Sequence, residues 1–296
     1  MKIYYSGALN HSHILERNDI KKILISIHGQ PNIYKKIKKN EWMIDGTREL
    51  MIDNGAFSAW NSGKKIITVE EYTDFCKKFH DEFSPFFESI YYIGLDHIPG
   101  EKNTKPSKEQ VDKACDITMS NYQYMTNNGV KNVLPVVHQF EDVEWVKKYE
   151  EYTDFICLSP ANDQSNKSRA KWLDEVYSII NPKTKTHGLA ATGKYLVKRY
   201  SWYSTDSISW LKPFVFGQVF EWEFFELNLH RFVTLNKNEI WRLKLYEIFL
   251  SYFNDDLSQQ EKSDYHMDYH IKQYKTLENY ITQLWAKRGI VWDEKL

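Results

Sequence analysis

The sequence predicts an α/β protein, a (β/α)8 barrel of the TIM type with a helical appendage at its C-terminal end. Eight short runs rich in β-forming residues alternate with helical patterns over roughly the first 210 residues. The 296-residue length suits one such barrel, and no Gly/Ser/Pro-rich linker divides the chain. Alternating strands and helices imply parallel strands joined by right-handed crossovers. The eight runs are Lys2–Tyr5, Lys22–Ile27, Glu49–Asp53, Ile90–Asp96, Asn132–His138, Asp154–Leu158, Lys185–Leu189 and Trp202–Asp206.

The helices between these runs have recognisable beginnings and ends. Thr68–Glu71 and Ser107–Gln110 both read as capping boxes, and apolar residues at helical spacing follow each of them. Asn128–Gly129 is typical of the end of the second helix. A third apolar stripe at residues 173–180 ends before Pro182, which cannot continue a helix.

The pattern changes near residue 212, so we expect a barrel domain over residues 1–212 and an extension over 213–296. The extension begins with an aromatic, irregular connector at Phe214–Phe232. Helical periodicity then covers Glu239–Phe253 and about Gln259 to Lys287. We expect this extension to pack on the barrel, because no linker separates the two.

Composition excludes several classes of protein. The formal net charge is −1, so no overall field attracts nucleic acid or membranes, and nucleic-acid binding has to come from local patches. No apolar run is long enough for a signal peptide or a membrane span. The three cysteines are widely separated, which favours reduced thiols in a cytoplasmic protein (host cytoplasm if phage-encoded) over a disulfide framework or a metal site.

Aspartates follow three of the predicted strands. Asp53, Asp96 and Asp206 all lie where a run ends, which in a barrel is the catalytic face. Any one of them could simply cap the next helix, but three in the same register favour a pocket lined by carboxyl groups. Two carboxyls across a pocket can transfer a glycosyl group with retention, one as nucleophile and one as acid/base. The residue pattern alone leaves open which carboxyl has which role.

Five segments around these strand ends carry a family resemblance. In chain order they are Asp53-Asn54-Gly55-Ala56-Phe57, Gly94-Leu95-Asp96-His97-Ile98-Pro99, Leu134-Pro135-Val136-Val137-His138-Gln139, His187-Gly188-Leu189-Ala190 and Asp206-Ser207-Ile208-Ser209-Trp210. They resemble, in the same order, motifs of the tRNA-guanine transglycosylase superfamily. The resemblance covers most of the barrel, from about Asp53 to Trp210.

The resemblance implies a role for each matching residue. Asp206 would be the covalent nucleophile and Asp53 the catalytic acid/base. Asp96 would bind the Watson–Crick face of guanine, and Phe57 would stack on the base. The remaining expected substrate-binding residues are Asn54, Gly55, His138, Gln139, Gly188 and Leu189, with His138 and Gln139 as alternative readers of the base edge.

Departures from the family pattern indicate which branch of the superfamily the chain resembles most. The tRNA enzymes have a structural zinc site of three cysteines and a histidine after the barrel, whereas no cysteine follows Cys157 here, so we expect no zinc subdomain. The RNA-binding modules of the archaeal members are also missing. The chain looks closest to the DNA-modifying branch, whose phage and bacterial members insert 7-deazaguanine bases. The resemblance therefore implies a transferase (pentosyltransferase) that replaces guanine in DNA by a preQ0-type 7-deazaguanine, with no cofactor and no metal.

The expected partners are DNA and a 7-deazaguanine base. Lys194, Lys198 and Arg199 follow the seventh strand on the catalytic side and could contact the nucleic-acid backbone. Three alternatives remain: a tRNA-guanine transglycosylase, a nucleoside or DNA glycosidase that uses the same two aspartates, and a non-catalytic partner subunit. The sequence also leaves open a homodimer or a helper protein that opens the duplex, and it predicts no membrane association.

Overall fold

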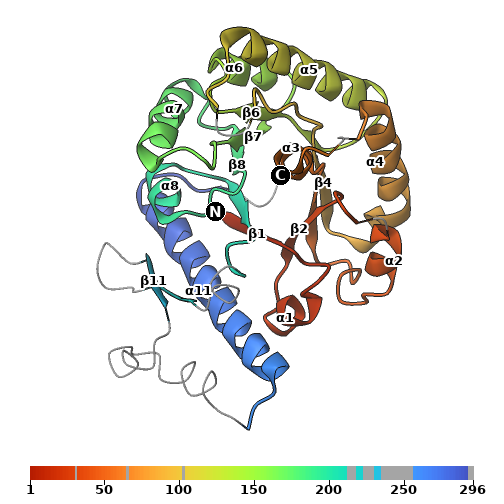
Figure 1. Ribbon diagram of the computed structural model, residues 1–296, viewed down its shortest axis with the longest axis vertical. Helices are drawn as coiled ribbons and strands as arrows, with labels where there is room; N and C mark the ends of the chain where they lie inside the picture. Colours follow the sequence, from red (N-terminus) through yellow and green to blue (C-terminus); the bar gives the residue numbers. More distant parts are fainter. Residues whose placement is uncertain are drawn as a thin grey trace.

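A computed structural model of the chain describes residues 1–30, 32–64, 67–101, 104–211, 218–222, 230–234 and 256–292. Parallel strands form a ring and helices surround it, so the predicted TIM-like α/β barrel is confirmed (Figure 1). The strands pair in the order β5-β4-β3-β2-β1-β9-β8-β7-β6. Their bounds are β1 Lys2–Ser6, β2 Lys22–Ser26, β3 Glu49–Asp53, β4 Ser89–Ile93, β5 Val133–Leu134, β6 Val136–His138, β7 Phe155–Ser159, β8 Lys185–Gly188 and β9 Ser204–Ser207.

The ring closes through one interrupted strand. Strands β5 and β6 stand at opposite ends of the pairing order, yet only Pro135 separates them in the chain. Proline has no N–H to donate to a neighbouring strand, so the pairing breaks at this residue. The Pro135 carbonyl still accepts the Cys157 N–H at 2.8 Å, and the Leu134 carbonyl accepts the Gly94 N–H at 2.8 Å. The predicted strand at Asn132–His138 is therefore one structural strand with a break in the middle.

Helices cover the outside of the ring, with both predicted capping boxes in place. The side chain of Thr68 accepts the Glu71 N–H, and that of Ser107 accepts the Gln110 N–H. The helices are α1 Ser12–Arg17, α2 Ile33–Lys38, α3 Ala56–Ser62, α4 Val69–Phe83, α5 Lys108–Asn127, α6 Glu144–Glu150, α7 Asn166–Ile179, α8 Lys194–Arg199 and α11 Gln259–Lys287, with a 3-10 turn at Ser84–Phe86.

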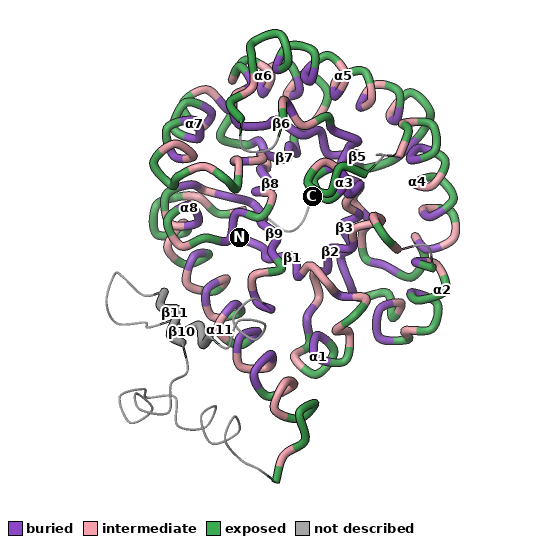
Figure 2. The backbone as a smooth tube through the Cα atoms, in the orientation of Figure 1, coloured by how far each residue is buried: buried purple, intermediate pink, exposed green. Residues whose placement is uncertain are grey.

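Successive side chains of each strand point to opposite faces of the sheet, so they pack in two separate cores. Odd residues of β1 such as Ile3 and Tyr5 pack against the helices, whereas Tyr4 belongs to a separate cluster inside the ring. The tube view shows the strands buried and the helices buried on one face only (Figure 2). The interior cluster comprises Tyr4, Leu24, Met51, Ile93, Leu134, Val136, Phe155, Cys157 and Tyr203. It fills the barrel, as expected for this fold.

A polar layer covers this interior cluster at the carboxyl ends of the strands. Because side chains two residues apart share a face, the residue two places after each interior residue also points inward. Met51 is followed in this way by Asp53, Val136 by His138, and Cys157 by Ser159. The period-two pattern thus places carboxyl, imidazole and hydroxyl groups together above an apolar base.

A buried ion pair closes the opposite end of the barrel. The Lys2 ammonium lies 2.9 Å and 3.0 Å from the two carboxylate oxygens of Glu49, and the Tyr4 hydroxyl donates to the same carboxylate at 3.0 Å. Burial by itself lowers the pKa of Lys2, but the hydrogen bond and charge of Glu49 outweigh it and raise the pKa above its ordinary value. Lys2 therefore keeps its positive charge in the folded protein.

We expect Glu49→Gln to destabilise the protein by about 3 kcal/mol, because it leaves the buried Lys2 ammonium without its carboxylate. Urea unfolding monitored by tryptophan fluorescence measures the loss. The double variant Lys2→Met/Glu49→Gln is the matched control and should recover most of the stability, since no buried charge remains. A single variant as stable as the wild type would contradict this interpretation.

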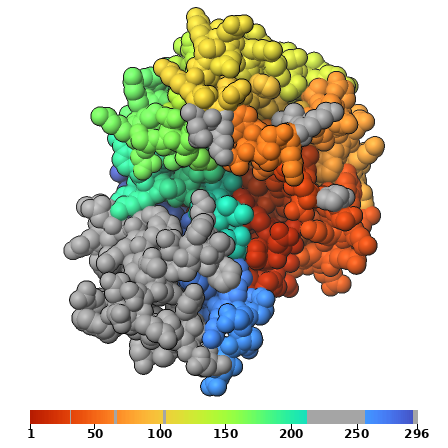
Figure 3. Space-filling model, viewed as in Figure 1, coloured from red at the N-terminus to blue at the C-terminus, as the bar shows by residue number. Residues whose placement is uncertain are grey.

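The C-terminal extension packs on the barrel through α11. This helix lies against α1, α8 and β1, and the space-filling view shows its side chains beside those of the first segment of the chain (Figure 3). Strands β10 Gln218–Trp222 and β11 His230–Thr234 pair antiparallel, so the connector that we predicted to be irregular contains a hairpin. The predicted helix at 239–253 lies outside the described residues.

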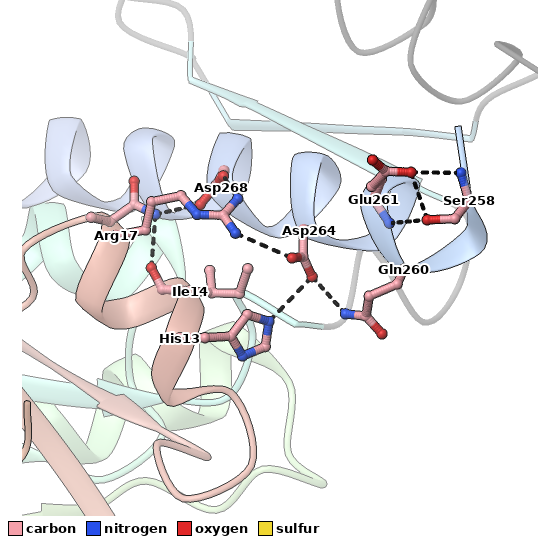
Figure 4. Close-up of polar contacts among 9 residues, drawn as sticks. His13, Ile14, Arg17, Ser258, Gln260, Glu261, Asp264 and Asp268 are labelled. Atoms are coloured by element: carbon pink, nitrogen blue, oxygen red, sulfur yellow. Dashed lines mark hydrogen bonds and ion pairs between the residues drawn. The ribbon is translucent and has the colours of Figure 1, made fainter. Parts of the chain in front are cut away.

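Charged side chains hold α11 against α1. Arg17 donates to Asp268 at 2.8 Å and to Asp264 at 3.2 Å, and the His13 ring lies 3.2 Å from Asp264 (Figure 4). The α11 N-terminus is closed by a capping box of Ser258 and Glu261. No helix of the described part of the chain is both long enough and apolar enough to cross a bilayer.

Candidate active site

A cavity of about 850 Å³ opens at the carboxyl ends of the strands, directly above the apolar interior. This is within the size range of small-molecule sites. Seven of the ten catalytic and substrate-binding residues expected from the sequence line it: Asp53, Asn54, Phe57, Asp96, His138, Leu189 and Asp206. The barrel therefore brings strand-end residues from five different strands and the loops after them to one place.

Asp206 is buried and surrounded by hydrogen-bond donors. It is the third residue of β9, and one carboxylate oxygen accepts the Ser6 hydroxyl of β1 at 3.0 Å. The other accepts the Ala190 N–H at 2.8 Å and lies 3.4 Å from His187 Nε2. These contacts fix the carboxylate at the cavity wall, in the manner required of a nucleophile that has to be held in one orientation.

The surroundings of Asp206 include an unusual backbone conformation and a buried histidine. Ala190 has a φ of +50°, a left-handed conformation that is unfavourable for a residue with a Cβ. In this conformation its N–H points at the carboxylate. His187 is fully buried, and its Nδ1 lies 2.8 Å from the Ser204 hydroxyl. His187 therefore contacts Ser204 through one ring nitrogen, and its other ring nitrogen lies beside Asp206 without forming a hydrogen bond.

Asp53 differs from Asp206 in its electrostatic surroundings. Burial raises the pKa of the Asp53 carboxyl, the nearby Ser26 hydroxyl and Gly55 N–H partly oppose this, and the charges of Asp96 and Asp206 add to it. The resulting pKa is about 6. A carboxyl with such a pKa can give up a proton and take it back near neutral pH, as a general acid/base must.

Asp96 is held between two side chains. Its carboxylate oxygens lie 2.8 Å from the Asn54 amide nitrogen and 2.8 Å from His138 Nε2. Asn54 also donates to the Gly94 carbonyl and accepts the Ala56 N–H. These two contacts hold the amide in the orientation in which it donates to Asp96.

The imidazole beside Asp96 is itself part of a buried charged cluster. Burial lowers the pKa of His138, but the hydrogen bond and charge of Asp96 outweigh it, and the net pKa lies above its ordinary value. Burial raises the pKa of the neighbouring Glu141 carboxyl to about 7, although the positive charge of His138 opposes this. His138 and Asp96 therefore share the floor of the cavity, and their contact favours the protonated form of the imidazole.

Three expected substrate-binding residues do not line the cavity. The Gln139 amide donates to the Ser168 hydroxyl and accepts the Ala161 N–H, both at 3.0 Å, so it faces away from the site. His138 is the one of the two candidate base readers that lines the cavity. Gly188 is packed so closely that a Cβ would lie 2.8 Å from the Cβ of Ala191. Gly55 lies in the turn between β3 and α3 and also does not line the cavity.

Gly55 permits the turn that joins β3 to α3. Its φ is +78°, and an added Cβ would collide with the His28 side chain. We expect Gly55→Ala to destabilise the protein by about 2 kcal/mol and to displace Asn54 and Asp53. Thermal unfolding measures this effect. Gly63→Ala is the matched control, because Gly63 also has a positive φ but open space around it; an equal loss in both variants would show that backbone conformation alone is responsible.

The three cations that were predicted to contact the nucleic-acid backbone differ in their surroundings. Arg199 makes a two-point ion pair with Asp174, at 3.0 Å and 2.7 Å, on the outer surface. The Lys198 ammonium lies 5.8 Å from the ring centre of Tyr280 on α11. Lys194 begins α8, directly after the cavity-lining Gly193. Of the three, Lys194 is the residue nearest in sequence to the cavity lining.

Sequence reasoning missed three residues at the site. Ser6 directly follows the predicted strand Lys2–Tyr5 but carries no charge, and His187 is noticeable in the sequence only through its neighbours. Arg169 lines the cavity from α7, ten residues after the end of β7 at Ser159. The period-two pattern of β1 could have indicated Ser6, whereas no local signal indicates Arg169.

No model of a protein family matches this chain, and no curated protein matches it either. Among the described residues, no group of three or more His, Cys, Asp and Glu side chains is arranged to hold a metal ion. The three cysteines have no disulfide partner and are buried.

Proposed function

We propose that this protein is a transglycosylase that replaces guanine in DNA by a 7-deazaguanine base. The observation that carries the proposal is the pair Asp53 and Asp206 in one cavity. The first is a carboxyl with a pKa of about 6, and the second is a carboxylate held by the Ser6 hydroxyl and the Ala190 N–H. Retaining glycosyl transfer requires such a pair, one carboxyl as the acid/base and one carboxylate as the nucleophile.

The proposed reaction balances within these two groups. A carboxylate oxygen of Asp206 attacks C1′ of the nucleotide, the C1′–N9 bond breaks, and N9 of guanine takes the proton of Asp53. The incoming 7-deazaguanine then gives its N9 proton to Asp53 as that nitrogen attacks C1′, and Asp206 leaves. Each half-reaction exchanges one C1′ bond for another, so the exchange needs no separate energy source.

In this proposal Asp96 recognises guanine. Guanine presents two adjacent donors, N1–H and the 2-amino group, which suit a carboxylate, whereas adenine has no such pair. Each carboxylate oxygen can accept two hydrogen bonds, so Asp96 retains acceptor capacity beyond His138 and Asn54. Phe57 is 53% exposed at the cavity rim, where it can stack on a base that has left its helix.

The proposal is tested by incubating the purified protein with single-stranded and duplex DNA containing labelled guanine, together with a 7-deazaguanine base. We expect label to be released in an amount equal to the deazaguanine found in the DNA by nucleoside mass analysis. Release without incorporation would identify a glycosidase instead. Exchange on tRNA but not on DNA would favour the tRNA reaction, and the absence of both would overturn the proposal.

A further inference from the structure

One arginine that lines the cavity has no carboxylate partner among the described residues. Arg169 is the only lysine or arginine among the described residues that line it, and it projects from the first turn of α7, whose N-cap is Ser165. Three aspartates face the same space, yet none of them forms an ion pair with Arg169. Burial lowers the pKa of the guanidinium, and no carboxylate among the described residues counters this effect.

The guanidinium is also poor in hydrogen bonds. Its Nε is buried and has no acceptor among the described residues, and its Nη2 lies 3.5 Å from Asn162 Oδ1, at the limit of a hydrogen bond. By contrast, Arg17 and Arg199 both make short contacts with carboxylates. A partly buried guanidinium with an unused donor costs free energy that a bound anion would recover.

The surroundings favour a phosphate as that anion. The planar guanidinium presents parallel donors that match two phosphate oxygens. Arg169 projects from the N-terminal end of a 14-residue helix, where the positive end of the helix dipole favours an anion. A nucleic-acid strand that enters a cavity lined by carboxyl groups also needs a positive group beside its backbone, because the aspartates repel it.

We propose that Arg169, with Asn162 and the first turn of α7, binds a phosphate adjacent to the nucleotide in the cavity. The substrate is therefore a nucleotide with a phosphate on the α7 side, and a free nucleoside lacks that contact. The identity of the nucleoside rests on the proposed function, whereas the phosphate contact can be measured by binding alone.

The test compares three probes by calorimetry: deoxyguanosine, its 5′-monophosphate and its 3′-monophosphate. We expect one monophosphate to bind the wild type at least about 10-fold more tightly than deoxyguanosine, and the preferred isomer identifies which phosphate lies beside α7. In Arg169→Gln this advantage should disappear while the affinity for deoxyguanosine stays the same. Arg169→Lys keeps the charge without the planar fork and should retain part of the advantage.

Lys167→Gln is the matched control, because Lys167 lies on the same turn of α7, is exposed and does not line the cavity. It should keep the full preference for phosphate. The inference is overturned if neither monophosphate binds the wild type more tightly than deoxyguanosine, or if the preference survives in Arg169→Gln. A phosphate preference that depends on Arg169 in a protein without base exchange would leave the inference standing and refute the proposed function.

Discussion

Asp206→Asn is expected to abolish base exchange, with a loss of about 10³-fold or more. The amide oxygen can still accept the Ala190 N–H, and the amide nitrogen can donate to the Ser6 hydroxyl oxygen, so the cavity should keep its shape. The amide is a poor nucleophile toward C1′, and the covalent intermediate cannot form. The effect is therefore chemical and not structural.

Denaturing electrophoresis measures this directly. Wild-type protein incubated with labelled DNA and no incoming base should carry the label covalently, and Asp206→Asn should not. The matched control is Asp112→Asn, an exposed carboxyl of α5 outside the cavity, which should react like the wild type. An Asp206→Asn protein whose exchange rate lies within 10-fold of the wild type would remove Asp206 from the chemistry.

Asp53→Asn should lower the rate of guanine release by about 10²-fold to 10⁴-fold, since the departing base then leaves without a proton. In the wild type, release should fall as the pH rises through about 6, because Asp53 loses its proton there. The variant should show no such decline. Rates of label release from pH 5 to pH 8 test both statements, and a wild-type profile that is flat across pH 6 would contradict the acid role.

The same substitution should stabilise the protein at high pH. Burial raises the pKa of Asp53 from 3.8 to about 6 in the folded state, so the folded protein holds this proton more tightly than the unfolded chain does. The contribution of Asp53 to stability is therefore greatest below about pH 4 and is lost as the pH rises to about 6. We expect Asp53→Asn to exceed the wild type by about 2 kcal/mol at pH 8 and by little at pH 4.5. Urea unfolding at the two values, with Asp112→Asn as the control, measures the difference.

The strands and the positions of the three aspartates follow from local sequence. Runs such as Glu49–Asp53 were predicted with their observed bounds, because buried β-branched and aliphatic residues end abruptly at a polar group. Pro135 shows the limit of this reasoning. It interrupts pairing inside a run that otherwise reads as one strand, and only the neighbouring strands show that the ring still closes there.

The details of the site depended on tertiary contacts that no local pattern reveals. Alternation from Val136 favours an inward His138 and an outward Gln139, but only the contacts of Gln139 with Ser168 and Ala161 decide between the two residues. The sequence predicted that Arg199 contacts the nucleic-acid backbone, and it could not show that Arg199 pairs with Asp174 of another helix. Arg169 remained unnoticed because a helix, and not a strand end, carries it to the cavity.

The contacts between α11 and β1 have a consequence for the order in which the site is assembled. The Ile3 N–H donates to Glu278 and the Met1 ammonium to Thr282, across 275 and 281 positions of the chain. Strand β1 also carries Ser6, which holds Asp206. During synthesis, β1 is therefore made early but can pack against α11 only after hundreds of further residues have been added. A ribosome-bound chain that stops before residue 259 would have both aspartates but an outer face of β1 still open to water.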